Sequence, residues 1–68
     1  MSRNFGLWMK TMRNINNMTQ SRLAKKVGVH YNSIIRWESG TQFPPLDVAE
    51  KIIEVLGSEL AIIKGETT

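Results

Sequence analysis

Apolar residues recur along this chain at the three- and four-residue spacing of an amphipathic helix. Leu23, Ala24 and Val27 form one such stripe, and the positions around them are mostly basic. Thr19 suits a helix N-cap, because its hydroxyl can accept a hydrogen bond from a free N–H of the first turn. Gly28 suits the other end, since glycine commonly ends a helix in the left-handed conformation. The pattern therefore predicts a short helix between these two residues.

A second short helix is predicted directly after that glycine. Ile34 and Trp37 are three residues apart and would face inward, and Gly40 would end the helix. The small side chain of Ala24 in the preceding helix leaves room for two helices that meet at a steep angle. This spacing of alanine, glycine and two apolar residues predicts a helix-turn-helix. The outer side of the second helix would carry Tyr31, Asn32, Ser33 and Arg36.

The residues before this helix-turn-helix, which we call the corner (residues 19–40), are predicted to form a helix over residues 5–16. Phe5, Met9 and Met12 would lie on its core stripe, and Asn17 would adopt the left-handed conformation just past its end. Trp8 lies off the stripe. It is either exposed by chance, which is common for single residues, or part of a contact between subunits.

A fourth helix is predicted from about residue 45 to residue 56, with Gly57 as its end. Pro45 could occupy its first turn, where the missing N–H costs nothing. Phe43, in the linker before it, is expected to pack into the core. The inward positions are Leu46, Ala49, Ile52, Ile53 and Leu56.

Length and charge narrow the class of protein. The 68 residues allow one small domain, and the lack of cysteine excludes disulfides. No apolar run is long enough to span a membrane, so we expect a cytoplasmic protein. Residues 1–36 hold seven basic residues and no acid, whereas residues 37–68 hold six acids and two bases. This asymmetry favours a polyanion as the partner of the first half.

The run from Thr19 to Val29, followed by Ser33 to Gly40, resembles the phage-repressor and Cro type of regulator, the xenobiotic-response-element family. The resemblance implies an all-α, lambda-repressor-like bundle of four or five helices that binds operator DNA as a dimer. It also implies an ion pair between Arg13 and Glu38. His30 departs from the family, which usually has a small polar residue there.

DNA binding assigns roles to the polar residues of the corner. Asn32 can form two hydrogen bonds with an adenine edge, and Arg36 two with guanine, while the Tyr31 ring can contact a thymine methyl. These three are the predicted base-reading residues. The predicted phosphate contacts are Gln20, His30, Ser33, Thr41, Lys10 and Arg22, of which His30 and Ser33 could instead cap the helix.

The last segment, residues 58–64, has adjacent β-branched residues and favours an extended strand. A strand that pairs with its copy in a second subunit would satisfy its backbone. The alternative is a fifth helix or a loose tail. The predicted dimer contacts are Trp8, Leu60, Ile62 and Ile63. The predicted organisation is a flexible N-terminus (1–4), a DNA-binding domain (5–57), the dimerisation strand (58–64) and a tail (65–68).

The leading functional hypothesis is a sequence-specific transcriptional regulator, most simply a repressor that binds a palindromic operator as a homodimer. The second is an antitoxin that also binds a toxin protein, and the third is a protein-interaction module without DNA binding. RNA polymerase is a further candidate partner if the protein activates. No enzyme is expected, because one histidine, no cysteine and no phosphate-binding glycine loop offer no catalytic site. We expect no cofactor, no metal and no membrane partner.

Overall fold

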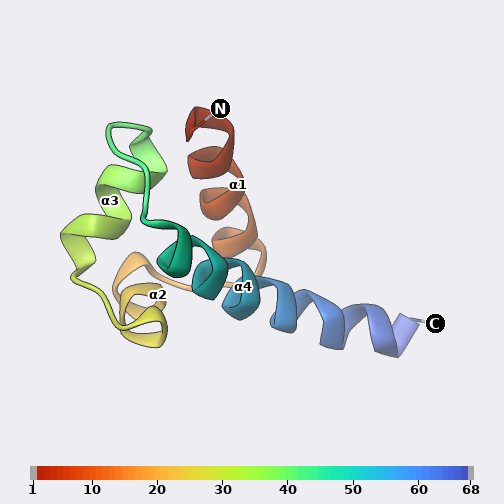
Figure 1. The fold of residues 1–68 in the computed structure, drawn as a ribbon. Helices are drawn as coiled ribbons and strands as arrows, with labels where there is room; N and C mark the ends of the chain where they lie inside the picture. Colours follow the sequence, from red (N-terminus) through yellow and green to blue (C-terminus); the bar gives the residue numbers. More distant parts are fainter. Residues whose placement is uncertain (1, 68) are drawn as a thin grey trace.

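The protein folds into four helices, seen here in a computed structural model that describes the backbone of residues 2–67 and the side chains of residues 4–57. They are α1 (Ser2–Ile15), α2 (Gln20–Val27), α3 (Tyr31–Ser39) and α4 (Leu46–Thr67). No strand occurs in the described backbone. Figure 1 shows α2 and α3 on one side of the bundle, and the second half of α4 extending away from the other helices.

The core lies between all four helices, and α3 packs against both α1 and α2. The side chains of Leu23 and Ile34 are fully buried in the same core cluster, and Ala24 is 3% exposed. The inward positions predicted for α2 and α3 are therefore confirmed. The buried cluster comprises Met9, Met12, Met18, Leu23, Ala24, Ile34, Trp37, Ile52 and Leu56.

The turns around α2 form as the sequence predicts. The backbone N–H of Arg22 donates to the hydroxyl of Thr19 over 3.0 Å, which is the expected N-cap. Gly28 ends α2 with φ of +87°. Asn17, just past α1, has φ of +54°, so its predicted left-handed conformation is also confirmed. These three residues set the direction of the chain where it enters and leaves α2.

Gly6 permits a close approach of α1 to the end of α3. A β-carbon at this position would lie 2.3 Å from the carbonyl oxygen of Trp37 and 2.8 Å from that of Glu38. Because backbone atoms cannot swing aside as a side chain can, only glycine fits here. The helix begins at Ser2, before the predicted start at residue 5, since no helix-breaking residue precedes Phe5.

The predicted C-terminal strand over residues 58–64 is wrong, because α4 continues as one helix to Thr67. Gly57 was expected to end this helix. A glycine inside a helix costs only about 1 kcal/mol, whereas extending an existing helix avoids the cost of a new nucleus. Residues 58–67 therefore extend the helix. The side chains of Leu60, Ile62 and Ile63 lie outside the described residues.

The inward face of α4 is narrower than predicted. Ala49, Ile52 and Leu56 are buried, but Leu46 is 76% exposed and Ile53 is 48% exposed, so both were wrongly placed in the core. These two residues lie to one side of the buried stripe. Helices α1 and α2 pack against the side of α4 that carries the stripe, and the sequence pattern alone cannot show where that cover stops.

Phe43 is also more exposed than predicted. Phe43 is 49% exposed, so the expected burial in the core does not occur, and its ring centroid lies 5.4 Å from that of Phe5. The Phe5 ring also stacks with that of Trp8, and the two ring centroids are 5.8 Å apart. The indole of Trp8 is thus half-buried by its own subunit.

In the described part of the chain, no helix combines the length and the apolar character needed to cross a membrane.

Candidate nucleic-acid interface

The outer face of α3 is the most distinctive exposed surface of the corner. Asn32 and Arg36 are exposed, and no hydrogen bond within the described part of the chain uses either side chain. Tyr31 is 45% exposed and Ile35 is 36% exposed on the same side. The structure thus places all three predicted base-reading residues, Tyr31, Asn32 and Arg36, on one solvent-facing surface.

The inner face of α3 is held by a buried ion pair. Arg13 Nε lies 2.7 Å from Glu38 Oε2, and Arg13 Nη2 lies 3.1 Å from Glu38 Oε1, which is a bidentate geometry. The two side chains are only 10% and 4% exposed. The ion pair that the family resemblance implies is therefore formed, and it joins α1 to α3.

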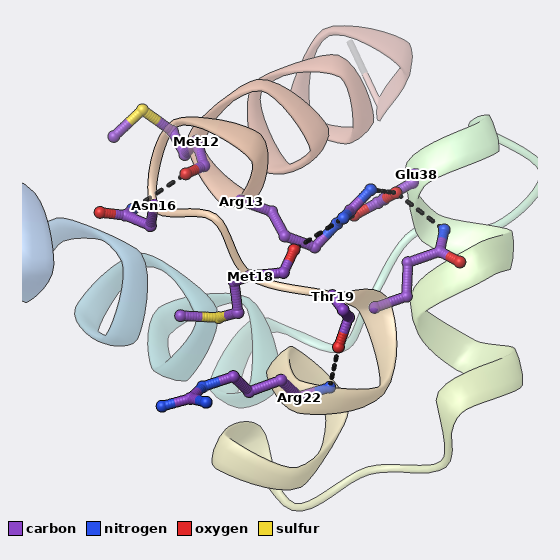
Figure 2. A network of polar contacts seen from close by, with 8 residues as sticks. Met12, Arg13, Asn16, Met18, Thr19, Arg22 and Glu38 are labelled. Atoms are coloured by element: carbon purple, nitrogen blue, oxygen red, sulfur yellow. Dashed lines mark hydrogen bonds and ion pairs between the residues drawn. The ribbon is translucent and has the colours of Figure 1, made fainter.

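The same network reaches two further parts of the chain (Figure 2). Arg13 Nη1 donates to the carbonyl oxygen of Met18 over 2.8 Å, and Gln20 Nε2 donates to Glu38 Oε1 over 3.0 Å. One hydrogen-bonded network thus joins α1, the turn after it, the start of α2 and α3. No buried side-chain nitrogen or oxygen in the described part of the chain lacks a partner. The network fixes the position of α3.

Gln20 has a role that the sequence did not indicate. It was predicted to hold a phosphate, but its side chain is half-buried and one of its amide hydrogens binds Glu38. The second amide hydrogen and the backbone N–H at the start of α2 are the groups left for a phosphate. The only sequence signal for the internal contact was that Glu38 is the single acid before residue 47.

The N-terminal end of α3 is capped by a histidine. The backbone N–H of Asn32 donates to His30 Nδ1 over 3.1 Å, so the capping alternative for His30 is formed. The backbone N–H of Ser33 donates to the carbonyl oxygen of His30 over 3.0 Å, and the Ser33 side chain is half-buried. The imidazole itself remains exposed beside the outer face.

The C-terminal end of α3 is closed by a hydroxyl pair. The Ser39 and Thr41 hydroxyl oxygens lie 2.8 Å apart, and Ser39 Oγ donates to the carbonyl oxygen of Arg36 over 3.0 Å. The backbone N–H of Thr41 donates to the same carbonyl over 3.0 Å. Both hydroxyls are exposed, so this end also presents polar groups next to the outer face.

The outer side of α2 is basic. Arg22, Lys25 and Lys26 are exposed there, and they border an open hollow of about 600 Å³. Lys10 is exposed on α1. None of these four side chains forms an ion pair within the described residues. The hollow has no acidic residue in its lining, which is Asn17, Thr19, Ser21, Arg22, Lys25 and Lys26.

These features together define a class of protein. Two short helices meet at a glycine turn, and the buried ion pair fixes the inner face of the second. The outer face of the second helix carries hydrogen-bonding side chains that have no partner among the described residues. A surface helix of this kind fits the major groove of duplex DNA, which is about 12 Å wide. The described residues contain no group of three potential ligands that could hold a metal ion. The class is that of helix-turn-helix DNA-binding proteins.

Comparison with known proteins identifies the family. The helix-turn-helix family model matches residues 9–63, and the chain belongs to this family, whose members include the Cro and phage-repressor regulators. An uncharacterized HTH-type transcriptional regulator of Methanocaldococcus jannaschii is 40% identical over 52 residues, which cover 76% of this chain and 79% of the relative. Another from Archaeoglobus fulgidus is 43% identical over 44 residues, which cover 65% of this chain and 62% of the relative. No solved structure matches.

Proposed function

We propose that this protein is a sequence-specific transcriptional regulator that represses a promoter by occupying a palindromic operator as a homodimer. The observation that carries the proposal is the outer face of α3, where Asn32 and Arg36 are exposed and have no hydrogen-bond partner within the described chain. Family membership supports the DNA-binding part of the proposal. Repression follows if the bound dimer covers DNA that RNA polymerase needs.

Base recognition would come from three side chains. Asn32 donates and accepts at an adenine edge, and Arg36 donates twice to guanine O6 and N7. Tyr31, four residues before Ile35, offers its ring to a thymine methyl and its hydroxyl to a base or phosphate. A good bidentate pair contributes about 1–3 kcal/mol of discrimination against a wrong base.

Phosphate contacts would position the helix in the groove. His30 and Ser33 lie at one end of α3, and Thr41 lies at the other, so the two ends can meet the DNA strands on either side of the groove. The start of α2 would add the free amide hydrogen of Gln20 and the helix N-terminus. Charges farther from the groove would come from Lys10 and Arg22.

Dimer formation would supply the second half-site. Leu7 and Ile15 on α1 are 62% and 54% exposed, and Leu46 and Ile53 on α4 are also exposed, so the subunit retains uncovered apolar surface. Beyond Leu56, the last described buried residue, α4 continues away from the bundle. These surfaces replace the strand as the proposed contact. Sedimentation equilibrium tests this step, and a species of 7.8 kDa at every concentration would contradict it.

The Arg36→Ala variant tests DNA recognition. Duplexes selected from random DNA by the parent protein provide the operator. The variant should bind this operator at least about tenfold more weakly, because the guanine contact is lost, while its melting temperature stays near that of the parent. Lys51→Ala removes an exposed positive charge from α4 and serves as the control, with binding close to the parent. Equal operator affinity for Arg36→Ala and the parent would refute the assignment.

The two alternative functions have less support. The antitoxin hypothesis was favoured by the predicted C-terminal strand, which the continuous α4 replaces. A protein-interaction module without DNA binding would have no need of an exposed arginine and asparagine together on the outer face of α3, whose one acid, Glu38, is turned inward to Arg13. Failure of the parent protein to select any duplex from random DNA would favour that module.

A further inference from the structure

Ile35 is an apolar residue in the middle of an otherwise hydrogen-bonding surface. It is 36% exposed on α3, three residues after Asn32 and directly before Arg36. Single exposed apolar residues are common on proteins and need no special explanation. This one, however, lies on the face that the proposed function places against DNA.

The Tyr31 ring extends the apolar surface. Tyr31 and Ile35 are separated by four residues on one helix, so their side chains are neighbours on its surface. Tyr31 is 45% exposed, and these two are the only large hydrophobic residues of α3 that are exposed. They form an apolar edge beside the polar line of Asn32 and Arg36.

The major groove offers one apolar group to such an edge. Each base pair presents hydrogen-bond donors and acceptors there, and only thymine adds a methyl group, at C5. An amide or a guanidinium gains little from this methyl, whereas an isoleucine side chain gains from excluding water around it. The chemistry of the edge therefore matches a 5-methylpyrimidine.

We propose that Ile35, together with the Tyr31 ring, contacts the 5-methyl group of a thymine in each half-site and selects thymine over uracil at that position. This inference rests on the proposed function, because it assumes that α3 enters the major groove. Asn32 and Arg36 would recognise bases through hydrogen bonds, and Ile35 would add recognition of a base through its methyl group. Removal of one buried methyl should weaken binding about fourfold, from about 0.8 kcal/mol per methyl-sized group.

The test replaces each thymine of a selected operator half-site, one at a time, with deoxyuridine. This change removes the methyl and leaves the base pairing and every other groove atom in place. The parent protein should bind about fourfold more weakly when one particular thymine is replaced. Ile35→Ala should show a clearly smaller difference between the thymine and uracil duplexes at that position, because mainly the Tyr31 ring is left to contact the methyl. Ile35→Val, which keeps the branched shape, should retain more of the discrimination.

Two control variants separate this role from others. Lys51→Ala changes an exposed site on α4 that lies outside the proposed contacts and should keep the full thymine preference. Asn32→Ala should lose overall affinity but still distinguish thymine from uracil at the position assigned to Ile35. Thermal melting of each variant shows that it is folded.

The inference is overturned if no single deoxyuridine weakens binding by the parent protein, or if Ile35→Ala keeps the thymine preference undiminished. Failure of the parent to select any duplex from random DNA would instead overturn the proposed function itself. Tight binding by a parent that ignores the methyl would overturn only the role of Ile35.

Discussion

The two faces of α3 are built from opposite chemistry. On the inner face, Ile34 and Trp37 are buried, and Glu38 is matched by a guanidinium and an amide. On the outer face, Asn32 and Arg36 have no hydrogen-bond partner within the described chain. The inner face decides where the helix sits, and the outer face decides what it can meet. Substitutions on the inner face should therefore lower the stability of the fold, and substitutions on the outer face should weaken DNA binding.

The largest effect is expected at the buried ion pair. Arg13→Ala would leave the Glu38 carboxylate, 4% exposed, with only Gln20 as a partner. Removal of one member of a buried pair costs about 3–5 kcal/mol, a large share of the ~5–15 kcal/mol that stabilises a typical domain. Urea unfolding followed by circular dichroism should show this loss.

Arg22→Ala is the matched control for that experiment, because Arg22 is an exposed arginine without an ion pair in the described residues. It should change the free energy of unfolding by less than about 0.5 kcal/mol. A similarly small change for Arg13→Ala would mean that the inner face does not depend on its charges. The double variant Arg13→Met/Glu38→Leu should recover part of the stability, since neither buried charge remains.

The corner itself could be predicted from the sequence. Thr19, Gly28 and Asn17 impose local backbone conformations that depend on few neighbours, and the spacing of Ile34 and Trp37 specifies one face of a short helix. The exposed positions of Asn32 and Arg36 follow from that spacing. Local chemistry was therefore enough to place the outer face of α3.

Features that depend on distant contacts could not be predicted in this way. The need for glycine at position 6 comes from the carbonyl groups of Trp37 and Glu38, which are far away in sequence. The contact between Gln20 and Glu38 likewise requires the assembled corner. The end of α4 was misjudged because a strand and a helix extension differ little in local preference, and the cost of one glycine did not decide between them.

A smaller effect is expected at the crossing of α1 and α3. Gly6→Ala would place a methyl group against two backbone carbonyls of α3, and relief of this clash must move one helix. Overpacking of this kind costs about 1–3 kcal/mol, partly offset by the better helix propensity of alanine. Thermal melting should show a lower midpoint for the variant.

Gly57→Ala is the same substitution where nothing lies within 4 Å of the added β-carbon. It should raise the free energy of unfolding by up to about 1 kcal/mol, because α4 is helical there. A loss of stability for Gly6→Ala together with a gain for Gly57→Ala would support the close approach of α1 to α3. A stabilising Gly6→Ala would show that the inner face tolerates an extra methyl.

The smallest effect is expected at His30, which lies where the two faces of α3 meet. Its Nδ1 caps the helix, while the rest of the exposed ring is near the proposed phosphate contacts. His30→Ala should lose about 0.5–1 kcal/mol of stability with the cap bond. His30→Ser should keep a cap, because a serine hydroxyl accepts the same kind of hydrogen bond. Melting and operator titration of both variants then distinguish the two roles: a folded His30→Ser protein with weakened binding assigns the ring to DNA, and one with unchanged binding assigns it to the cap alone.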